Sequence, residues 1–285
     1  MSRIVYVNGE FVPEAEAKVS VFDRGFMFAD GIYEVSSVLR GKLIDNNGHM
    51  VRMNRSLNEL DMAHPCTDEE IEAIQHELIK RNNLDEGLIY LQITRGAADR
   101  DFAYPKDTKP TLVLFTQAKN VLGNPIATKG ISVITVEDIR WARRDIKTVG
   151  LLAPCMAKMQ AKAAGADDAW MVEDGNITEG SSNNAYIVTK EGTIVTRQIG
   201  NEILNGITRR AVMALAAKHD YKVEERLFTV EECHNAAEAF ITSATMFVQA
   251  VVKIDDAVIG DGKPGTISNQ LREAYIAEAM AEIGD

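Results

Sequence analysis

The chain has 285 residues, of which 46% are hydrophobic, so it is long enough to build one large core or two smaller ones. Its net charge of -11 argues against a nucleic acid or an anionic membrane surface as the main partner. The first residues, MSRIVYVNGEF, lack a signal-peptide core, and no apolar run is as long as a membrane span. Three widely spaced cysteines form no metal-binding pattern and fit a reducing compartment. We therefore expect a cytoplasmic protein without a metal centre.

The first part of the chain predicts a small α+β domain. Alternating apolar and polar residues around Asn8 and Gly9 predict a β-hairpin with a type I′ turn over 3–13. Thr67 and Glu70 have the spacing of a capping box at the start of a helix over 67–82. We also expect a hairpin over 36–44, a helix over 48–62, and strands over 88–94 and 111–116. These elements assign residues 1–118 to one domain.

Residues 119–128, with Gly123 and Pro125, are the predicted interdomain linker. The following residues, 129–285, predict a larger α+β domain without the regular βαβ repetition or the GxGxxG motif of a Rossmann fold. The expected strands are 131–136, 169–172, 185–188, 193–196, 223–225, 239–242 and 248–254, and the expected helices are 154–164, 207–219, 229–233 and 266–283. In the last helix we expect Ile267, Leu271, Tyr275 and Met280 to face inward.

Lys147 and Glu179 are candidates for cofactor chemistry. A lysine that attacks a carbonyl must be reachable and partly desolvated, because only its neutral amine is a nucleophile. A carboxylate beside a pyridine nitrogen keeps that nitrogen protonated, which makes the ring a better electron sink. Most lysines and glutamates are solvated surface charges, so the pair alone does not establish this chemistry.

The segment Asn205-Gly206-Ile207-Thr208-Arg209-Arg210 has the form of a phosphate site. Gly206 would allow a close approach of the backbone, and the amides of Ile207 and Thr208 would open a helix whose N-terminus attracts an anion. An ordinary turn before a helix has the same pattern.

Several long motifs carry a resemblance to a known family. The run DIRW…DIK is followed by K-x-x-A-x-x-A-G-A and by DG-x-x-TEGS-x-N. This order resembles the fold-type IV pyridoxal-phosphate enzymes, namely the branched-chain aminotransferases, the D-amino-acid transaminases and the related aminodeoxychorismate lyases. The resemblance extends over nearly the whole chain and implies a two-domain α+β fold, a pyridoxal 5′-phosphate cofactor and a transamination reaction.

The resemblance assigns roles in cofactor binding. Lys147 would hold the cofactor as an internal aldimine and act as general base and acid, and Glu179 would bind the pyridine nitrogen. Arg52, in the motif HMVR at 49–52, matches the arginine that binds the phosphate. Leu204 would lean on the ring, and Ile207 and Thr208 would hold the phosphate. The turn at 242–245 matches a third phosphate element, in which Ser243 and Ala244 stand, although Ala244 lacks the hydroxyl that often occurs there.

The resemblance also points to substrate residues. The run DGIYEV at 30–35 is closer to the D-amino-acid transaminases than to the branched-chain enzymes, and it directs Tyr33 toward the substrate. The D-amino-acid enzymes carry R-x-H in a loop that reaches the partner subunit's site, where this chain has Arg100 and Phe102. Arg100 would bind the substrate carboxylate, and the loss of the histidine alters that recognition. Trp141 would be both core and pocket wall. Such a loop implies a homodimer.

The leading hypothesis is transamination between a D-amino acid such as D-alanine and a 2-oxo acid such as 2-oxoglutarate. Alternatives within the fold are a branched-chain L-amino-acid aminotransferase, an (R)-amine transaminase, which Phe102 favours, and a lyase of the aminodeoxychorismate type. A binding protein without catalysis is the alternative from a different class, and the presence of Lys147, Glu179 and Arg52 argues against it. Arg143 and Arg144 could attract a carboxylate, although a salt bridge is the simpler role for at least one of them.

Overall fold

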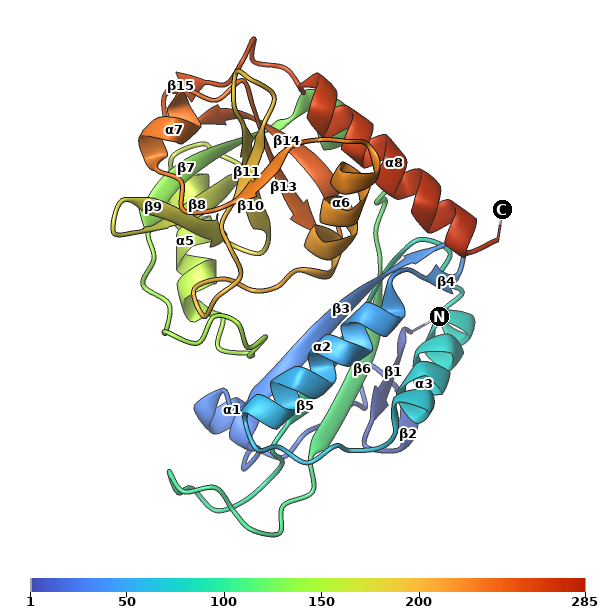
Figure 1. Ribbon diagram of the computed structural model, residues 1–285. Coiled ribbons are helices and arrows are strands. Elements are labelled where there is room, and N and C mark those ends of the chain that lie inside the picture. Colours follow the sequence, from blue (N-terminus) through green and yellow to red (C-terminus); the bar gives the residue numbers. More distant parts are fainter. Residues whose placement is uncertain (1, 285) are drawn as a thin grey trace. The chain divides into compact units, whose positions relative to one another are not determined.

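A computed structural model describes residues 2–284 and divides them into two compact units (Figure 1). The first unit contains the chain up to Val121 together with Ile146–Gly150, and the second contains Leu122–Asp145 and the chain from Leu151 onward. The short segment that carries Lys147 therefore belongs to the first unit, although the residues on both sides of it belong to the second.

The first unit is built on a six-stranded antiparallel sheet in the order β2-β1-β6-β5-β3-β4. Its strands are β1 (Ile4–Val7), β2 (Glu10–Pro13), β3 (Gly31–Leu39), β4 (Lys42–Leu43), β5 (Gly87–Thr94) and β6 (Thr111–Ala118). Both predicted hairpins are confirmed. Asn8 and Gly9 have φ of 48° and 105° between β1 and β2, as a type I′ turn requires.

The helices of this unit are α1 (Arg24–Phe28), α2 (Asn46–Glu59) and α3 (Asp68–Arg81). In Figure 1, α2 and α3 lie on the same face of the sheet. Leu57 of α2 and Ile71 and Leu78 of α3 are fully buried in one core with Ile32 and Ile89 of the strands. Burying these apolar faces is the main driving force that fixes the helices on the sheet.

The second unit contains a nine-stranded mixed sheet in the order β12-β11-β10-β13-β14-β7-β8-β9, with β15 paired to β14. The strands are β7 (Ile131–Glu137), β8 (Asp168–Glu173), β9 (Asn176–Gly180), β10 (Asn184–Val188), β11 (Ile194–Thr196), β12 (Val223–Glu225), β13 (Glu238–Ser243), β14 (Phe247–Ile254) and β15 (Ala257–Val258). The parallel strands β7 and β8 are connected through α5. All predicted strands of this part are present, and β9 and β15 were not expected.

The helices of this unit are α4 (Ile126–Lys129), α5 (Leu152–Ala163), α6 (Ile207–Lys218), α7 (Val230–His234) and α8 (Thr266–Glu282). Ala157 and Ala161 of α5 pack on Ala169 and Met171 of β8. The expected inward face of α8 is partly wrong, since Ser268, Leu271, Tyr275 and Ala279 are its buried residues whereas Ile267 and Met280 are half-buried. The four buried residues are three or four positions apart in the sequence, which is the spacing of one face of a helix.

Within residues 2–284, no helix combines the length and the apolar character needed to cross a membrane. The mixture of an antiparallel sheet, a mixed sheet and flanking helices confirms the α+β class.

Replacing Thr67 by alanine is expected to destabilise the protein by about 1 kcal/mol. The Thr67 hydroxyl accepts a hydrogen bond from the Glu70 amide (3.2 Å), and the Glu70 carboxylate accepts one from the Thr67 amide (2.8 Å), which satisfies two free donors at the start of α3. Urea unfolding of both proteins measures the difference. Thr266→Ala is the control, because Gly265 and not Thr266 is the N-cap of α8. Equal destabilisation by the two changes would contradict a capping role.

Candidate active site

Lys147 is placed against the start of β3 by backbone hydrogen bonds. The Tyr33 amide donates to the carbonyl of Lys147 (3.0 Å), and the Val149 amide donates to the carbonyl of Gly31 (3.0 Å). The Lys147 amine lies 4.2 Å from the centre of the Tyr33 ring, and the Lys147 side chain is only half-buried. The amine is thus reachable and has an aromatic surface on one side, as nucleophilic lysine chemistry requires.

The ring of Tyr33 is fixed by a row of aromatic residues on neighbouring strands. It stacks on Tyr90 of β5 at 5.6 Å between ring centres, and Tyr90 stacks on Phe115 of β6 at 4.7 Å. Burial raises the pKa of Tyr90 to about 12, so this ring stays neutral. The row therefore holds Tyr33, and the amine above it, at a defined position.

Arg52 is held by a buried carboxylate next to this lysine segment. Its Nε and Nη2 donate to the two oxygens of Glu34 at 2.8 Å and 2.7 Å, which is a bidentate pair. The Nδ1 of His49 lies 2.7 Å from the same carboxylate. Glu34, His49 and Arg52 are all buried, and they come from β3 and α2. Arg52 is consequently a fixed cation and not a solvated helix charge.

The protonation states in this cluster follow from the pairing. Burial by itself would raise the pKa of the Glu34 carboxyl, but the charge and hydrogen bonds of Arg52 and His49 outweigh burial and hold the pKa at about 2. Burial lowers the pKa of His49, against the opposing effect of Glu34. An ionised carboxylate only accepts hydrogen bonds, so a neutral His49 must donate from Nδ1.

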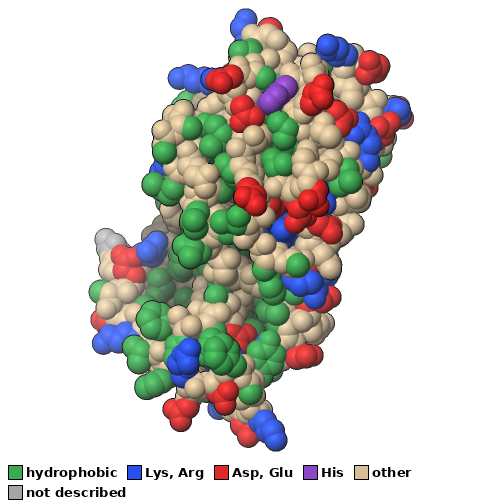
Figure 2. Space-filling view, turned by 90° about the vertical axis from the view of Figure 1, so that its left-hand side faces the viewer, with side chains coloured by type: hydrophobic (Ala, Val, Ile, Leu, Met, Phe, Trp, Pro, Cys, Tyr) green, Lys and Arg blue, Asp and Glu red, His purple; other side chains and the backbone are tan. Residues whose placement is uncertain are grey.

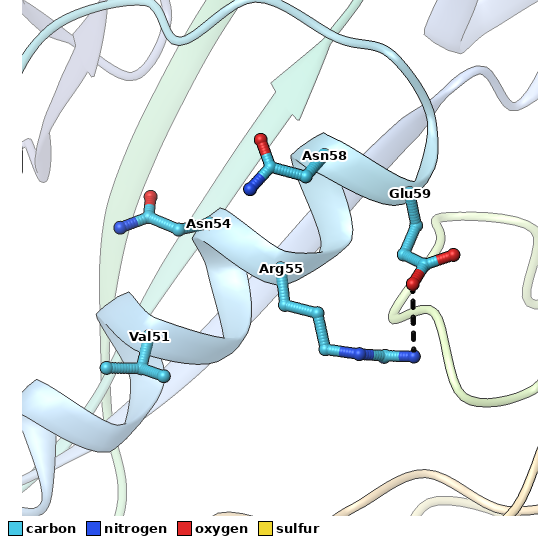
Figure 3. A pocket seen from close by; sticks show the side chains of 5 residues that line it. All are labelled: Val51, Asn54, Arg55, Asn58 and Glu59. Atoms are coloured by element: carbon cyan, nitrogen blue, oxygen red, sulfur yellow. Dashed lines mark ion pairs between the residues drawn. The ribbon is translucent and has the colours of Figure 1, made fainter.

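The outer face of α2 differs from this buried face. Val51, Asn54, Arg55, Asn58 and Glu59 line an open depression there (Figure 3). Arg55 and Glu59 form an ion pair of 3.6 Å along the helix, and both side chains are exposed. Exposed ion pairs of this kind contribute little to stability. We therefore assign the candidate site to the buried face of α2, which carries His49 and Arg52.

In the second unit, Glu179 of β9 is buried and held on both oxygens. Arg140 donates to Oε1 at 2.5 Å, Asn184 donates to Oε2 at 3.0 Å, and the Leu204 amide lies 3.3 Å and 3.2 Å from the two oxygens. Arg140 also forms a bidentate pair with Asp138. The orientation of the Glu179 carboxylate is therefore fixed before any ligand arrives.

The same network reaches the N-terminus of α6. Asn184 donates a second hydrogen bond to the Leu204 carbonyl (2.8 Å), and Gly206 is the N-cap of the helix. A Cβ on Gly206 would overlap the Oδ1 of Asn184, so only glycine fits this contact. Among the described residues, no side chain caps the helix, so the first amides, those of Ile207 and Thr208, have no capping acceptor and suit an anion.

Ser243 and Ala244 stand at the turn after β13, where the Ser243 hydroxyl accepts from the Met246 amide (3.2 Å).

The expectation that Trp141 belongs to the core is wrong, because it lies in a loop after β7 and is 48% exposed. Arg143 pairs with Asp145 at 2.9 Å and Arg144 with Glu173 at 2.7 Å, so both arginines have the salt bridges that the sequence favoured for at least one of them.

Arg100 and Phe102 lie in the exposed loop between β5 and β6 of the first unit. The ring centres of Phe102 and Phe28 are 5.7 Å apart. The Arg100 guanidinium lies 5.4 Å from the Phe28 ring and 5.5 Å from the Phe102 ring. The phenylalanine that stands in place of the histidine thus gives Arg100 an aromatic surrounding.

Each unit gathers its own part of the predicted set. Tyr33, Arg52 and Lys147 lie around β3 in the first unit, and Glu179, Leu204, Ile207 and Thr208 are linked in the second. The partners that orient them had no predicted role, namely Glu34, His49, Arg140 and Asn184. Each of these four partners lies in a motif quoted above or within two residues of one. Their pairing with the site residues depends on contacts between elements that are distant in sequence.

Glu34→Gln is expected to lower the free energy of unfolding of the apoprotein by about 3 kcal/mol near neutral pH, because Arg52 keeps its buried charge and loses its bidentate anion. The folded pKa of Glu34 lies below its ordinary value, so the wild-type stabilisation is present above about pH 4.5 and is lost as the pH falls toward 2. Denaturant unfolding at a series of pH values should therefore find the two proteins converging in acid. A difference that stays constant down to about pH 2 would contradict the pairing.

Comparisons with known proteins identify the family of the chain. The family model for amino-transferase class IV matches residues 31–254. A D-alanine aminotransferase of Staphylococcus haemolyticus is 40% identical over 272 residues, which cover 95% of this chain and 96% of that protein.

Two solved structures have the same fold. The branched-chain amino acid aminotransferase of Escherichia coli has a TM-score of 0.92 at 20% identity, with 99% of this chain and 96% of that chain covered. A branched-chain amino acid aminotransferase of T.th. with pyridoxamine 5′-phosphate has a TM-score of 0.90 at 27% identity, with 99% and 95% covered. The fold-type IV architecture expected from the motifs is confirmed, and the chain belongs to the amino-transferase class IV family.

Proposed function

We propose that this chain transfers the amino group of a D-amino acid such as D-alanine to a 2-oxo acid such as 2-oxoglutarate, with pyridoxal 5′-phosphate as cofactor. The observation that carries the proposal is the 40% identity to a D-alanine aminotransferase over nearly the full length of both chains. The run DGIYEV at 30–35, with Tyr33 beside the Lys147 amine, supports the same subgroup.

The residues present fit the cofactor. Uncapped amides at the start of α6 and the buried cation of Arg52 suit a phosphate, and the oriented Glu179 carboxylate suits a pyridine nitrogen. We propose Ile207, Thr208, Arg52, Ser243 and Ala244 as phosphate residues, and Leu204 as a contact for the ring. When bound, the cofactor supplies an aldehyde for the amine and an electron sink for the substrate Cα–H bond.

Lys147 is proposed as the catalytic residue. Its half-buried amine, placed above the Tyr33 ring, would form the covalent link, and it would then take the proton from the substrate Cα and deliver it to the carbon of the cofactor aldehyde. Glu179 would hold the proton on the pyridine nitrogen throughout. Arg140 donates to the Oε1 of Glu179, so the Glu179 carboxylate keeps one orientation.

Tyr33, Arg100 and Trp141 are proposed as substrate residues. Arg100 would bind the substrate carboxylate, with the rings of Phe28 and Phe102 beside its guanidinium. A branched-chain L-amino-acid aminotransferase is the second candidate, since the T.th. enzyme with the branched-chain name shares 27% identity and a TM-score of 0.90.

A homodimer is proposed as the working assembly. Val19, Val21, Phe22 and Phe26 of the first unit are between 50% and 76% exposed. Hydrophobic side chains gather on the lower part of the face that Figure 2 presents, on the side where α1 lies. An apolar surface of this kind is typical of an interface, and a second copy is the partner that the family pattern implies.

The domain roles and the compartment complete the proposal. We propose 1–118 as the small domain, 119–128 as the linker and 129–285 as the cofactor-binding domain, with the exception of Ile146–Gly150, which belongs to the first unit. The three cysteines, all within the described part of the chain, are free, which fits the cytoplasm.

Lys147→Ala is expected to lower turnover of D-alanine with 2-oxoglutarate by about three orders of magnitude or more, because both the covalent attachment and the proton transfer are lost. Steady-state assay of pyruvate formation measures this effect. Lys190→Ala, on an exposed lysine in the turn between β10 and β11, is the control and should keep full activity. Retention of full activity by Lys147→Ala would remove the mechanism.

The enantiomer preference is tested by adding single amino acids to the holoenzyme without an acceptor. D-Alanine should convert the absorbance band of the bound cofactor to that of its amine form, whereas L-leucine should leave it unchanged. (R)-1-Phenylethylamine tests the amine alternative in the same panel. Conversion by L-leucine and not by D-alanine would contradict the assignment to D-amino acids.

A further inference from the structure

Two arginines of the first unit share one carboxylate in the interior. The Nε of Arg24 and the Nε of Arg95 donate to the same Oδ2 of Asp30, at 2.7 Å and 2.8 Å. Arg24 is 2% exposed and Arg95 is 6% exposed. Neither arginine has a part in the proposed chemistry. One carboxylate balances only one of the two cations, so the remaining guanidinium donors require other acceptors.

Backbone carbonyls supply these acceptors, and for Arg24 they belong to the loop between β5 and β6. Its Nη1 donates to the carbonyl oxygens of Asp101 (2.6 Å) and Ala103 (3.5 Å). These carbonyls flank Phe102, and Asp101 follows Arg100 directly in the chain. Arg95 donates instead to Leu60 and Asp61, on the connection after α2.

Aromatic contacts also hold the loop between β5 and β6. The Arg95 guanidinium lies 3.5 Å from the centre of the Tyr104 ring. The Arg24 guanidinium lies 4.6 Å from the centre of Phe28, whose ring also contacts Phe102 and Arg100. Arg24 and Phe28 are four residues apart on α1, so one short helix supplies both the donor and the ring.

We infer that Arg24 is a positioning residue for substrate recognition, because it anchors the loop that carries Arg100. This inference rests on the proposed role of Arg100 as the carboxylate-binding residue. The residues from Asp99 to Tyr104 are exposed. A loop of this kind samples several conformations unless it is tied to the interior. Release of the loop would leave donors of a buried guanidinium without acceptors, and this coupling holds Arg100 at one place.

Arg24→Lys tests the inference with the charge retained. A lysine can pair with Asp30, but its single nitrogen cannot also reach the Asp101 and Ala103 carbonyls in the geometry of a guanidinium. We expect the KM for D-alanine to rise by about tenfold while kcat stays within about twofold, because the chemical groups are untouched. The absorbance of the bound cofactor should be unchanged.

A double-mutant cycle with Arg100→Ala separates positioning from a general structural effect. In the Arg100→Ala background, Arg24→Lys should change the KM by less than about twofold, since the residue it positions is absent. An equal rise of the KM in both backgrounds, or no rise in either, would overturn the positioning role. If Arg100→Ala itself leaves the KM unchanged, the proposed role of Arg100 fails. Trypsin digestion then tests separately whether Arg24 anchors the loop.

Limited trypsin digestion of the holoenzyme reports on the conformation of the loop and does not depend on an activity measurement. Cleavage after Arg100 and Lys106 should be faster by about tenfold in Arg24→Lys, and an unchanged rate would overturn the anchor. Tyr104→Leu, which alters only a half-exposed ring, should shift the KM and the cleavage in the same direction, and it keeps the test decisive if Arg24→Lys does not fold. The matched control is Arg81→Lys, whose arginine pairs with Glu77 and lies 4.2 Å from the Phe11 ring, and it should change neither quantity.

Discussion

The short backbone pairing between β3 and the segment around Lys147 is the contact on which the candidate site depends. The hydrogen bonds of Tyr33 with Lys147 and of Val149 with Gly31 make this segment part of the first unit. Without them, a flexible lysine would have no defined position. With them, its amine lies over the Tyr33 ring, which stacks on Tyr90, and Tyr90 in turn stacks on Phe115.

Buried charge pairs fix the orientation of the other proposed site residues and of the arginines at the loop. Glu34 orients Arg52, Arg140 orients Glu179, and Asp30 orients Arg24 and Arg95. A buried charge is tolerated only with partners and hydrogen bonds, so each of these side chains is confined to one geometry. Under the proposed function, these groups are preorganised for a charged cofactor and a charged substrate.

The sequence predicted most regular elements, because hairpin turns, capping residues and apolar periodicity act over a few residues. Asn8-Gly9 and the capping box of Thr67 are examples. The short strand β9, which carries Glu179, was missed because its residues Asn176–Gly180 lack apolar alternation. The inward face of α8 was misplaced because small residues, Ser268 and Ala279, are buried there in place of larger apolar ones. The proposed site residues came from long motifs, whereas their partners could not be derived from spacing. Arg140 meets Glu179, and Glu34 meets Arg52, only because strands and helices distant in sequence are packed together.

We propose the Lys147 amine as the point of covalent attachment for pyridoxal 5′-phosphate. Reduction of the holoenzyme with borohydride, followed by peptide mapping with mass spectrometry, tests it directly. We expect one phosphopyridoxyl adduct, located on Lys147. An adduct on a different lysine, or a holoenzyme in which Lys147 is unmodified, would contradict it.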